Sequence, residues 1–312
     1  MSSRPLLSIV TPCYNEASNV DELYARIKAA IAPLTQYDFE ILFIDNHSED
    51  DTVVKLKQFA AQDPMVKIIV NARNFGHIRS PYYGILQSSG VATIYLASDL
   101  QDPPEKIPEF IKLWEDGYML VMATKPVSAG ATLMHQMRKA YYRFLDGISD
   151  VSLLADSTGF GLYDKVVLDH LRQIQDPYPY LRGLICELGY EIKTVPFSQP
   201  RRLRGVSKNN FYTLYDMAML GVVSHSKMPL RLASMFGFVL AICSFLAAIG
   251  FLLYKLFNWS QVPLGFAPFA ILVMLLFGMM FIFIGVLGEY IGSIHTYVQR
   301  RPIVVEKERI NF

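Results

Sequence analysis

Two long apolar runs near the carboxyl terminus constrain the fold of this 312-residue chain more than any other feature. Residues 233–257 and 266–291 are almost wholly apolar, and about 20 such residues cross the core of a bilayer as a helix. Lys255 lies close to the end of the first run, from where its side chain can reach the membrane surface. Two buried core helices are the alternative, but the runs are adjacent, long and nearly uncharged, which favours two membrane spans.

Basic residues flank these runs on their outer sides only. The connecting sequence "NWSQVPLG" has no Lys or Arg, so the positive-inside rule predicts a hairpin with both termini in the cytoplasm. Trp259 and Tyr290 lie where an aromatic belt is expected. We therefore predict a multi-pass protein of the cytoplasmic (inner) membrane. The basic residues are Arg201, Arg202, Arg204, Lys208, Lys227 and Arg231 before the first run, and Arg300, Arg301, Lys307 and Arg309 after the second.

Charge and cysteine content exclude several classes of protein. A net charge of +1 gives no reason to expect a nucleic-acid partner. The cysteines Cys13, Cys186 and Cys243 are odd in number and scattered, which predicts neither a disulfide framework nor a zinc site. We divide the chain into a cytoplasmic domain (1–209), an interfacial amphipathic helix with linker (210–231), two transmembrane helices (232–292) and a cytoplasmic tail (293–312).

Short apolar runs alternate with helical stretches through the first 125 residues. The runs "LLSIVTP", "FEILFID", "VKIIVNA", "VATIYLAS" and "MLVMATK" have the continuous apolar character of strands buried on both faces. Alternation of strand and helix predicts an α/β domain with a mostly parallel sheet. The later run "DSTGFGLYDK" is small and Gly-rich, so we expect a backbone segment that passes close to a ligand.

Polar side chains follow the expected strands at the edge where such sheets bind ligands. "TPCYNE" follows the first strand, "DNHSEDD" the second, "NARNFGH" the third and "SDLQD" the fourth. Asp99 and Gln101 present hard oxygen ligands, which suit Mg²⁺ or Mn²⁺ bound to a substrate diphosphate. We expect Asp102 to cap the turn with Pro103 and Pro104 instead.

The motifs, taken in order, resemble the blocks of the polyprenyl-phosphate glycosyltransferases. These are family 2 enzymes of the GT-A fold, which is Rossmann-like, and they are similar to dolichyl-phosphate mannosyltransferase and to bactoprenol glucosyltransferases. The resemblance covers nearly the whole chain, including the paired apolar runs. It is carried by "SIVTPCYNE", "FIDNHSEDDT", "NARNFGH", "SDLQDPPE", "STGFGLYD", "RGVSK" and "GEYIGSIHTYVQRRPIVVEK".

The resemblance implies a role for each matching residue. Asp99 and Gln101 would bind the metal, and Asp99, Asp156, Arg202 and Lys208 would be the catalytic residues. Tyr14 and Pro12 could instead pack a turn, Asn74 could cap a helix, and Arg202 and Lys208 could contact lipid headgroups. The nucleotide-sugar set, for a UDP- or GDP-linked donor, is Pro12, Tyr14, Glu16, Asp45, Arg73, Asn74 and Asp99, and the acceptor-phosphate set is Arg202, Arg204, Ser207 and Lys208.

Several positions depart from the pattern of the relatives. Ala97 replaces the first carboxylate of the usual Asp-x-Asp, and Asn46 replaces the second Asp of an Asp-Asp pair. Mannosyltransferase relatives have Thr-Ser-Gly-Phe-Arg where this chain has Ser-Thr-Gly-Phe-Gly at 157–161. The Arg of the relatives is thus replaced by Gly161, and Arg204 can offset its absence. Glucosyltransferase relatives often have an Asp, proposed as base, where this chain has Gly159.

A missing base is tolerable because a polyprenyl phosphate is already anionic at neutral pH. The resemblance thus implies in-line transfer of a sugar to such a lipid with inversion at the anomeric carbon, and it suggests a homo-oligomer. One alternative is a non-catalytic membrane scaffold on a degenerate glycosyltransferase domain. Another is an enzyme that acts on a glycan or protein, although the chain has no Gln-x-x-Arg-Trp run of the processive synthases.

Overall fold

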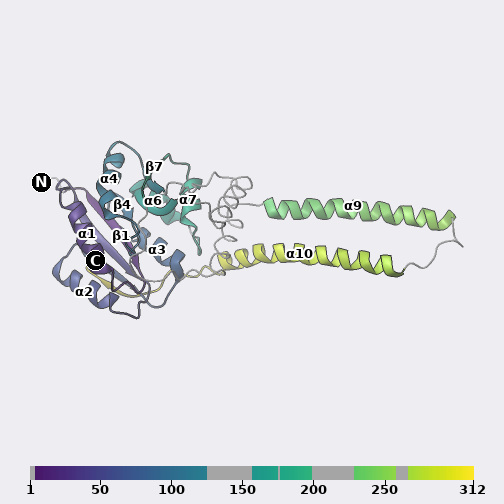
Figure 1. The fold of residues 1–312 in the computed structure, drawn as a ribbon, viewed down its shortest axis with the longest axis horizontal. Coiled ribbons are helices and arrows are strands. Elements are labelled where there is room, and N and C mark those ends of the chain that lie inside the picture. The colour runs from purple at the N-terminus through teal and green to yellow at the C-terminus, as the bar shows by residue number, and fades with distance from the viewer. Residues whose placement is uncertain (1–3, 125–156, 175, 199–227, 258–265) are drawn as a thin grey trace.

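The protein consists of a sheet domain and a pair of long helices that extend away from it (Figure 1). The computed structural model describes residues 4–124, 157–174, 176–198, 228–257 and 266–312.

Eight strands of the described chain form one mixed sheet in the order β7-β5-β6-β4-β1-β2-β3-β8. β1 pairs in parallel with β2 and β4, β2 with β3, and β5 with β7. β6 and β8 run antiparallel to their neighbours. The strands are β1 (Leu6–Cys13), β2 (Asp38–Asp45), β3 (Val66–Asn71), β4 (Ala92–Tyr95), β5 (Leu120–Thr124), β6 (Ser157–Asp164), β7 (Ile192–Pro196) and β8 (Glu306–Ile310).

Helices cover both faces of the sheet, which is why the central strands are apolar on both sides. Successive strand residues point to opposite faces, so Ile9 packs with α1, α2 and α4, whereas Val10 packs with α3, α6 and α7. The helices of the domain are α1 (Val20–Ile31), α2 (Thr52–Gln62), α3 (Gly76–Leu86), the short 3₁₀ helix η1 (Pro104–Lys106), α4 (Ile107–Glu115), α6 (Lys165–Gln173) and α7 (Leu181–Glu187). The predicted α/β domain with a mostly parallel sheet is confirmed.

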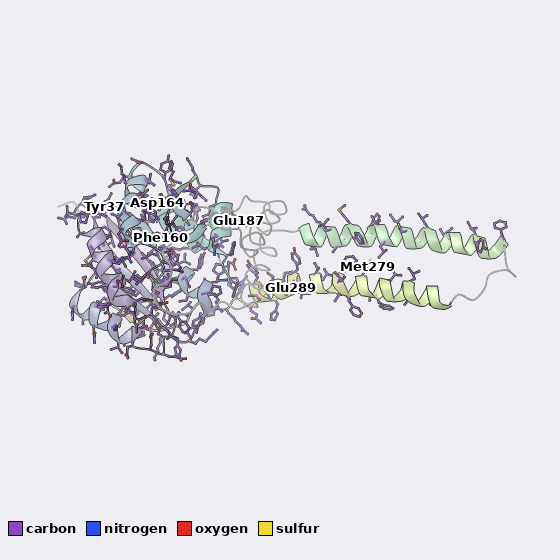
Figure 2. All side chains as sticks on the ribbon, viewed as in Figure 1. Tyr37, Phe160, Asp164, Glu187, Met279 and Glu289 are labelled. Carbon is purple, nitrogen blue, oxygen red and sulfur yellow. The ribbon has the colours of Figure 1, made fainter. Side chains whose placement is uncertain are left out.

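The Gly-rich run, which the sequence predicts to pass close to a ligand, forms the strand β6. β6 lies between β4 and β5 in the sheet. Its side chains alternate between the two cores, with Phe160 and Leu162 on one side and Tyr163 on the other. Phe160 stands inside the sheet domain, in contact with Phe110 of α4 (Figure 2). The glycines at 159 and 161 conceal this period from the sequence.

The last residues of the chain also belong to the sheet, although the sequence analysis separates 293–312 as a tail. β8 pairs antiparallel with β3 and forms the outer strand. Asn311 secures it by donating its amide to the carbonyl oxygens of Ala60 and Val66 at 2.8 and 2.9 Å. The alternation of charged and apolar residues in "EKERI" fits an edge strand with one solvated face.

The two long helices, α9 (Met228–Phe257) and α10 (Phe266–Val298), run side by side beyond the domain (Figure 1). Among the described residues, one stretch is long and apolar enough to cross a membrane, namely Leu276–Val298, and none of it is buried. Side chains project outward from both helices, as Figure 2 shows around Met279 of α10. Phe238 of α9 and Phe281 of α10 are 69% and 66% exposed, so these surfaces require an apolar environment. The predicted interfacial helix falls largely outside the described residues.

Candidate active site

A cavity of about 510 Å³ lies where the loops after β1 and β4 meet the loop before α3. This is the carboxyl edge of the parallel strands, where the sequence analysis places the ligand. The cavity is lined by Pro12, Cys13, Tyr14, Glu16, Asn46, Asn74, Gly76, His77, Ser80, Pro81, Tyr95, Ala97, Ser98 and Asp99. Five of the residues predicted to bind the donor sugar nucleotide are therefore on its wall: Pro12, Tyr14, Glu16, Asn74 and Asp99.

The loop after β1 is held by the loop after β2. The backbone N–H of Asn15 donates to Ser48 Oγ at 2.8 Å, and that of Glu16 donates to Thr52 Oγ1 at 2.8 Å. In return, Asn15 Oδ1 accepts from the N–H of Glu49 at 2.8 Å. These cross-links fix the backbone that carries Pro12, Tyr14 and Glu16 on the cavity wall.

Asp45 ends β2 and is fully buried next to this wall. Its carboxylate accepts hydrogen bonds from the hydroxyl and the backbone N–H of Ser48. Burial raises the pKa of Asp45 above 3.8, and the Ser48 hydrogen bonds oppose that rise. Asp45 therefore braces the β2 loop, and it is absent from the residues that line the cavity.

Asn46 explains why this chain has an amide where relatives have a second Asp. Its Nδ2 donates to Asn74 Oδ1 at 2.9 Å and to the Gly76 carbonyl at 3.2 Å. Its Oδ1 accepts from Asn71 Nδ2 at 3.1 Å and from the Phe75 N–H at 2.9 Å. A carboxylate at 46 could not make the two donor contacts, so the amide joins the ends of β2 and β3 to the start of α3.

Asn74 and Arg73 lie before α3 but are placed differently. Asn74 Oδ1 accepts the N–H of Gly76, the first residue of α3, at 2.8 Å, and Asn74 also lines the cavity. Arg73 is exposed and stacks over the Phe75 ring at 4.1 Å from its centroid. It is not among the residues that line the cavity.

The turn after β4 separates Asp99 from Asp102. Asp99 lines the cavity and accepts the N–H of Gln101 at 3.1 Å. Asp102 is 4% exposed and accepts the N–H of Ala97 at 3.0 Å, which confirms that it caps the turn. Gln101 is half-buried and is absent from the cavity lining. Ala97 does line the cavity, so a carboxylate at that position would share this wall.

Each of the first four strands is followed by a residue at positive φ. Asn15, His47 and Leu100 have φ of 56°, 67° and 61°, and Gly76 has 86°. Leu100 is only 3% exposed, and a buried leucine in this region stores backbone strain of order 1–3 kcal/mol. Such strain gathers at sites where the backbone is shaped for a ligand.

The remaining predicted site residues lie outside the described residues. These are Asp156, Arg202, Arg204, Ser207 and Lys208. Within the described chain, no group of three or more His, Cys, Asp and Glu side chains is arranged to hold a metal ion.

The structure adds cavity residues that the sequence analysis did not select. Cys13, His77, Ser80 and Tyr95 all line the cavity. The pKa of the Cys13 thiol is raised by burial and by the charges of Asp45 and Glu16, so the thiol is protonated at neutral pH. His77 ends the quoted motif "NARNFGH", and its place in the polar segment after the third strand was the available signal.

Comparison with known proteins identifies the family. Residues 8–172, more than half of the chain, match glycosyl transferase family 2. The chain belongs to glycosyl transferase family 2. It is thus a glycosyltransferase, and its mixed sheet with two helical layers is the GT-A fold expected from the sequence.

Curated relatives align over nearly the full chain. An uncharacterized glycosyltransferase of Bacillus subtilis (strain 168), YkcC, is 33% identical over 98% of this chain and 94% of its own length. A bactoprenol glucosyl transferase derived from prophage SfII in Shigella flexneri is 30% identical, covering 97% of each chain. The resemblance stated from the motifs is confirmed at this level.

A solved structure resembles the fold over part of its length. It is a mannosyltransferase from Pyrobaculum calidifontis in complex with GDP-Man and Mn²⁺, with 16% sequence identity and a TM-score of 0.49. The alignment covers 74% of this chain and 65% of that chain, just under two thirds of the solved protein.

Proposed function

We propose that this glycosyltransferase transfers a sugar from a UDP- or GDP-linked donor to a polyprenyl phosphate, undecaprenyl or dolichyl, at the cytoplasmic membrane face. The product would be a lipid-linked monosaccharide used in glycan modification. The observation that carries the proposal is a cavity with Asp99 on its wall in a chain that also exposes the apolar helix α10. Full-length relatives named bactoprenol glucosyl transferase support the choice of a lipid acceptor.

The donor side of the proposal rests on the cavity wall. Pro12, Tyr14 and Glu16 are held in place by the cross-linked loops, and a nucleoside fits a site built from a rigid turn and an aromatic ring. Asp45 supports this loop pair from behind. Asn74 orients the start of α3, whose first backbone N–H groups favour negative charge. Arg73 is proposed to act from the rim of the cavity.

The oxygen donors present fit a hard divalent cation, Mg²⁺ or Mn²⁺. Such ions take one or two protein carboxylates and complete their shell with phosphate oxygens and water. Asp99 would supply the carboxylate and Gln101 an additional oxygen. When bound, the ion would neutralise charge that develops on the leaving nucleoside diphosphate. Because Ala97 leaves one carboxylate fewer than in relatives, metal affinity would depend strongly on the donor diphosphate.

The acceptor side requires charge neutralisation and positioning. A phosphate oxygen of the lipid attacks the anomeric carbon, the bond from that carbon to the diphosphate oxygen breaks, and the nucleoside diphosphate leaves with both electrons. Attack in line inverts the anomeric carbon. Arg202, Arg204, Ser207 and Lys208 are proposed to hold the acceptor phosphate, and Asp156 to orient it. No proton has to be removed from the nucleophile, so a strong base is unnecessary.

The membrane arrangement is part of the same proposal. We propose that α9 and α10 span the membrane as a hairpin, with the sheet domain and both termini in the cytoplasm. The exposed aromatic side chains of both helices and the Arg300 and Arg301 pair after α10 support it. The boundaries at 209, 231 and 292 and the association into a homo-oligomer stay predictions, which protease mapping of inverted vesicles and light scattering in detergent would test.

The test is transfer of label into lipid. Purified full-length protein in detergent is incubated with undecaprenyl phosphate and radiolabelled UDP- and GDP-sugars, with Mg²⁺, Mn²⁺ or EDTA. We expect metal-dependent label in the lipid phase from one donor, lost in Asp99→Ala and kept in Asp116→Ala, an exposed aspartate after α4.

The same experiment separates the competing functions. Nucleotide-sugar binding without transfer to any lipid would favour the non-catalytic scaffold, for which Ala97 is the supporting observation. Label that appears only in added glycan or protein would instead favour a glycan- or protein-directed enzyme.

A further inference from the structure

A second, smaller cavity adjoins the first and carries a cation that the motifs do not include. It encloses about 100 Å³ between α3, β4, β6 and α7. His77, Pro81 and Tyr95 line both cavities, so the two share a wall. Arg182, at the start of α7, lines the smaller one.

Arg182 is held at this wall by a neutral partner. Its Nη1 donates to the carbonyl oxygen of Ser157 at 2.9 Å, and its guanidinium carbon lies 5.9 Å from the ring centroid of Tyr180. The side chain is half-buried, and none of the described carboxylates forms an ion pair with it. A partly buried guanidinium with several N–H donors and no anionic partner in the described part of the chain is suited to an anionic ligand.

The charge of Arg182 reaches the shared wall. Burial lowers the pKa of His77, and the positive charge of Arg182 lowers it further, so His77 is neutral at neutral pH. Burial and the charge of Asp102 raise the pKa of Tyr95, and Arg182 opposes that rise. Arg182 therefore contributes to the potential of the space between Asp99 and α7.

No other side chain can supply a cation from the neighbouring strand. β6 has glycines at 159 and 161, and a Cβ added to Gly161 would lie 2.2 Å from the carbonyl oxygen of Val121 and 3.0 Å from Met122 Sδ. The backbone of this chain therefore leaves no room for a side chain at 161. Among the described residues that line the smaller cavity, Arg182 of α7 is the arginine or lysine present.

We propose that Arg182 is a positioning residue that holds a phosphate group of a reactant at the junction of the two cavities. The inference rests on the proposed function, because both reactants of that transfer carry phosphate. The phosphate belongs either to the donor diphosphate or to the lipid acceptor, and the guanidinium fork would bind either through paired N–H donors.

The test measures binding of each ligand separately in the full chain. Calorimetry with UDP and GDP, and with undecaprenyl phosphate in detergent, is carried out on wild type, Arg182→Gln and Arg182→Lys. The matched control is Arg26→Gln, which removes an arginine of α1 that pairs with Glu105 away from both cavities. Steady-state kinetics then give kcat and the KM of each substrate.

We expect Arg182→Gln to weaken one ligand by about 10- to 100-fold, the effect of losing a hydrogen bond to a charged group. Weaker nucleotide binding assigns the donor diphosphate, and a raised lipid KM with unchanged nucleotide affinity assigns the acceptor. Arg182→Lys should recover part of the loss because it keeps the charge. Arg26→Gln should leave both affinities unchanged.

A thermal melt distinguishes these effects from damage to the fold. Loss of the Ser157 contact alone would lower the Tm by a few degrees in Arg182→Gln without changing either affinity, and that result overturns the proposal. If the wild type binds a nucleotide but makes no lipid product, the proposed function fails, while the two binding measurements still decide the role of Arg182.

Discussion

The two edges of the central sheet differ in how completely their buried polar groups are hydrogen-bonded. At the amino-terminal edge they are paired with one another, whereas at the carboxyl-terminal edge the backbone is strained and several have no partner among the described residues. Both edges are formed by the same strands and covered by the same helices, so the difference reflects what each edge is built to do.

Glu40 organises the amino-terminal edge. It is 3% exposed, and its carboxylate accepts from the hydroxyl of Ser8, from the N–H and hydroxyl of Ser89 at 2.7 Å, and from Lys67 Nζ at 2.6 Å. Burial alone would raise the pKa of Glu40, but Lys67 and the two serines lower it below 4.5. This edge therefore stabilises the ionised carboxylate.

The carboxyl-terminal edge has the opposite properties. The buried atoms without a hydrogen-bond partner among the described residues are Thr11 Oγ1, Asn19 Oδ1, Asn71 Oδ1 and Arg79 Nε, all at the end of β1 or β3 or on the segments that follow. Residues at positive φ follow β1 to β4. Burial raises the pKa of Asp45, and the hydrogen bonds to its carboxylate do not fully offset that rise. Backbone strain of this kind is typical of sites shaped for a ligand, whereas the amino-terminal edge holds the fold.

The largest effect should come from Asp99, on the cavity wall. Asp99→Ala should lower kcat/KM by roughly 100- to 1000-fold, the size expected when a group that stabilises developing charge is removed. The free energy of unfolding should change little. Asp102→Ala is the contrasting variant, because it leaves the Ala97 N–H unsatisfied and should lower stability by about 1–3 kcal/mol. Urea denaturation in detergent and the transfer assay measure the two quantities. Equal loss of activity in both variants would remove the distinction between them.

Glu40→Ala should destabilise the protein by about 3 kcal/mol, because it leaves the partly buried ammonium of Lys67 without its carboxylate partner. The affinity for the donor nucleotide should stay unchanged. Glu105→Ala is the control, since it breaks an exposed pair with Arg26 that contributes at most about 1 kcal/mol.

The pH dependence of Glu40 follows from its lowered pKa. Its contribution to stability is present above the ordinary value of 4.5 and is lost as the pH falls through the lower value of the folded state. Urea midpoints measured from pH 7 down to pH 3 should fall less steeply in Glu40→Gln than in wild type. Identical slopes would show that Glu40 does not anchor this edge.

Ala97→Asp should raise metal affinity by about tenfold, or 1.4 kcal/mol, because it adds a second carboxylate to the wall that carries Asp99. Titration of Mn²⁺ in the presence of the nucleoside diphosphate, followed by electron spin resonance, measures it. Ala97→Asn is the control of similar size without the charge. Unchanged affinity in both variants would place the metal away from residue 97.

The smallest effect concerns Asp45. Its pKa is raised in the folded state, so its ionisation costs stability as the pH rises through the window just above 3.8. Asp45→Asn should therefore leave stability at pH 7 unchanged or higher by less than about 1 kcal/mol, while it weakens nucleotide binding. Urea midpoints at pH 7 and calorimetry with UDP and GDP test both parts. A large loss of stability would show that the Ser48 contacts require the carboxylate.

Local patterns were enough to predict much of the domain. The apolar runs that became β1 to β5 and the polar turns after β1 to β4 are contiguous in the chain, and their periodicity depends on near neighbours only. The positions of Asp99 on the cavity wall and of Asp102 in the turn followed from the same reasoning, since prolines at 103 and 104 end the strand.

Contacts between distant segments were beyond this reasoning. β6 was missed because its glycines carry no side-chain pattern, and its place between β4 and β5 depends on pairing with both. β8 joins β3 across most of the chain length, and Arg182 lines the smaller cavity because α7 packs against β6. Asn46 looked like a lost charge until its four hydrogen bonds showed an amide that joins β2, β3 and α3.

Strand and helix periods, apolar length and turn chemistry are properties of neighbouring residues, and they determined the α/β domain, its polar edge and the apolar helices. Sheet order, the space between the loops and the charge that each buried group experiences depend on partners far away in the chain. Tertiary structure alone decided that Glu40 anchors one edge, that Asp45 supports the other from behind, and that Arg182 lines the smaller cavity.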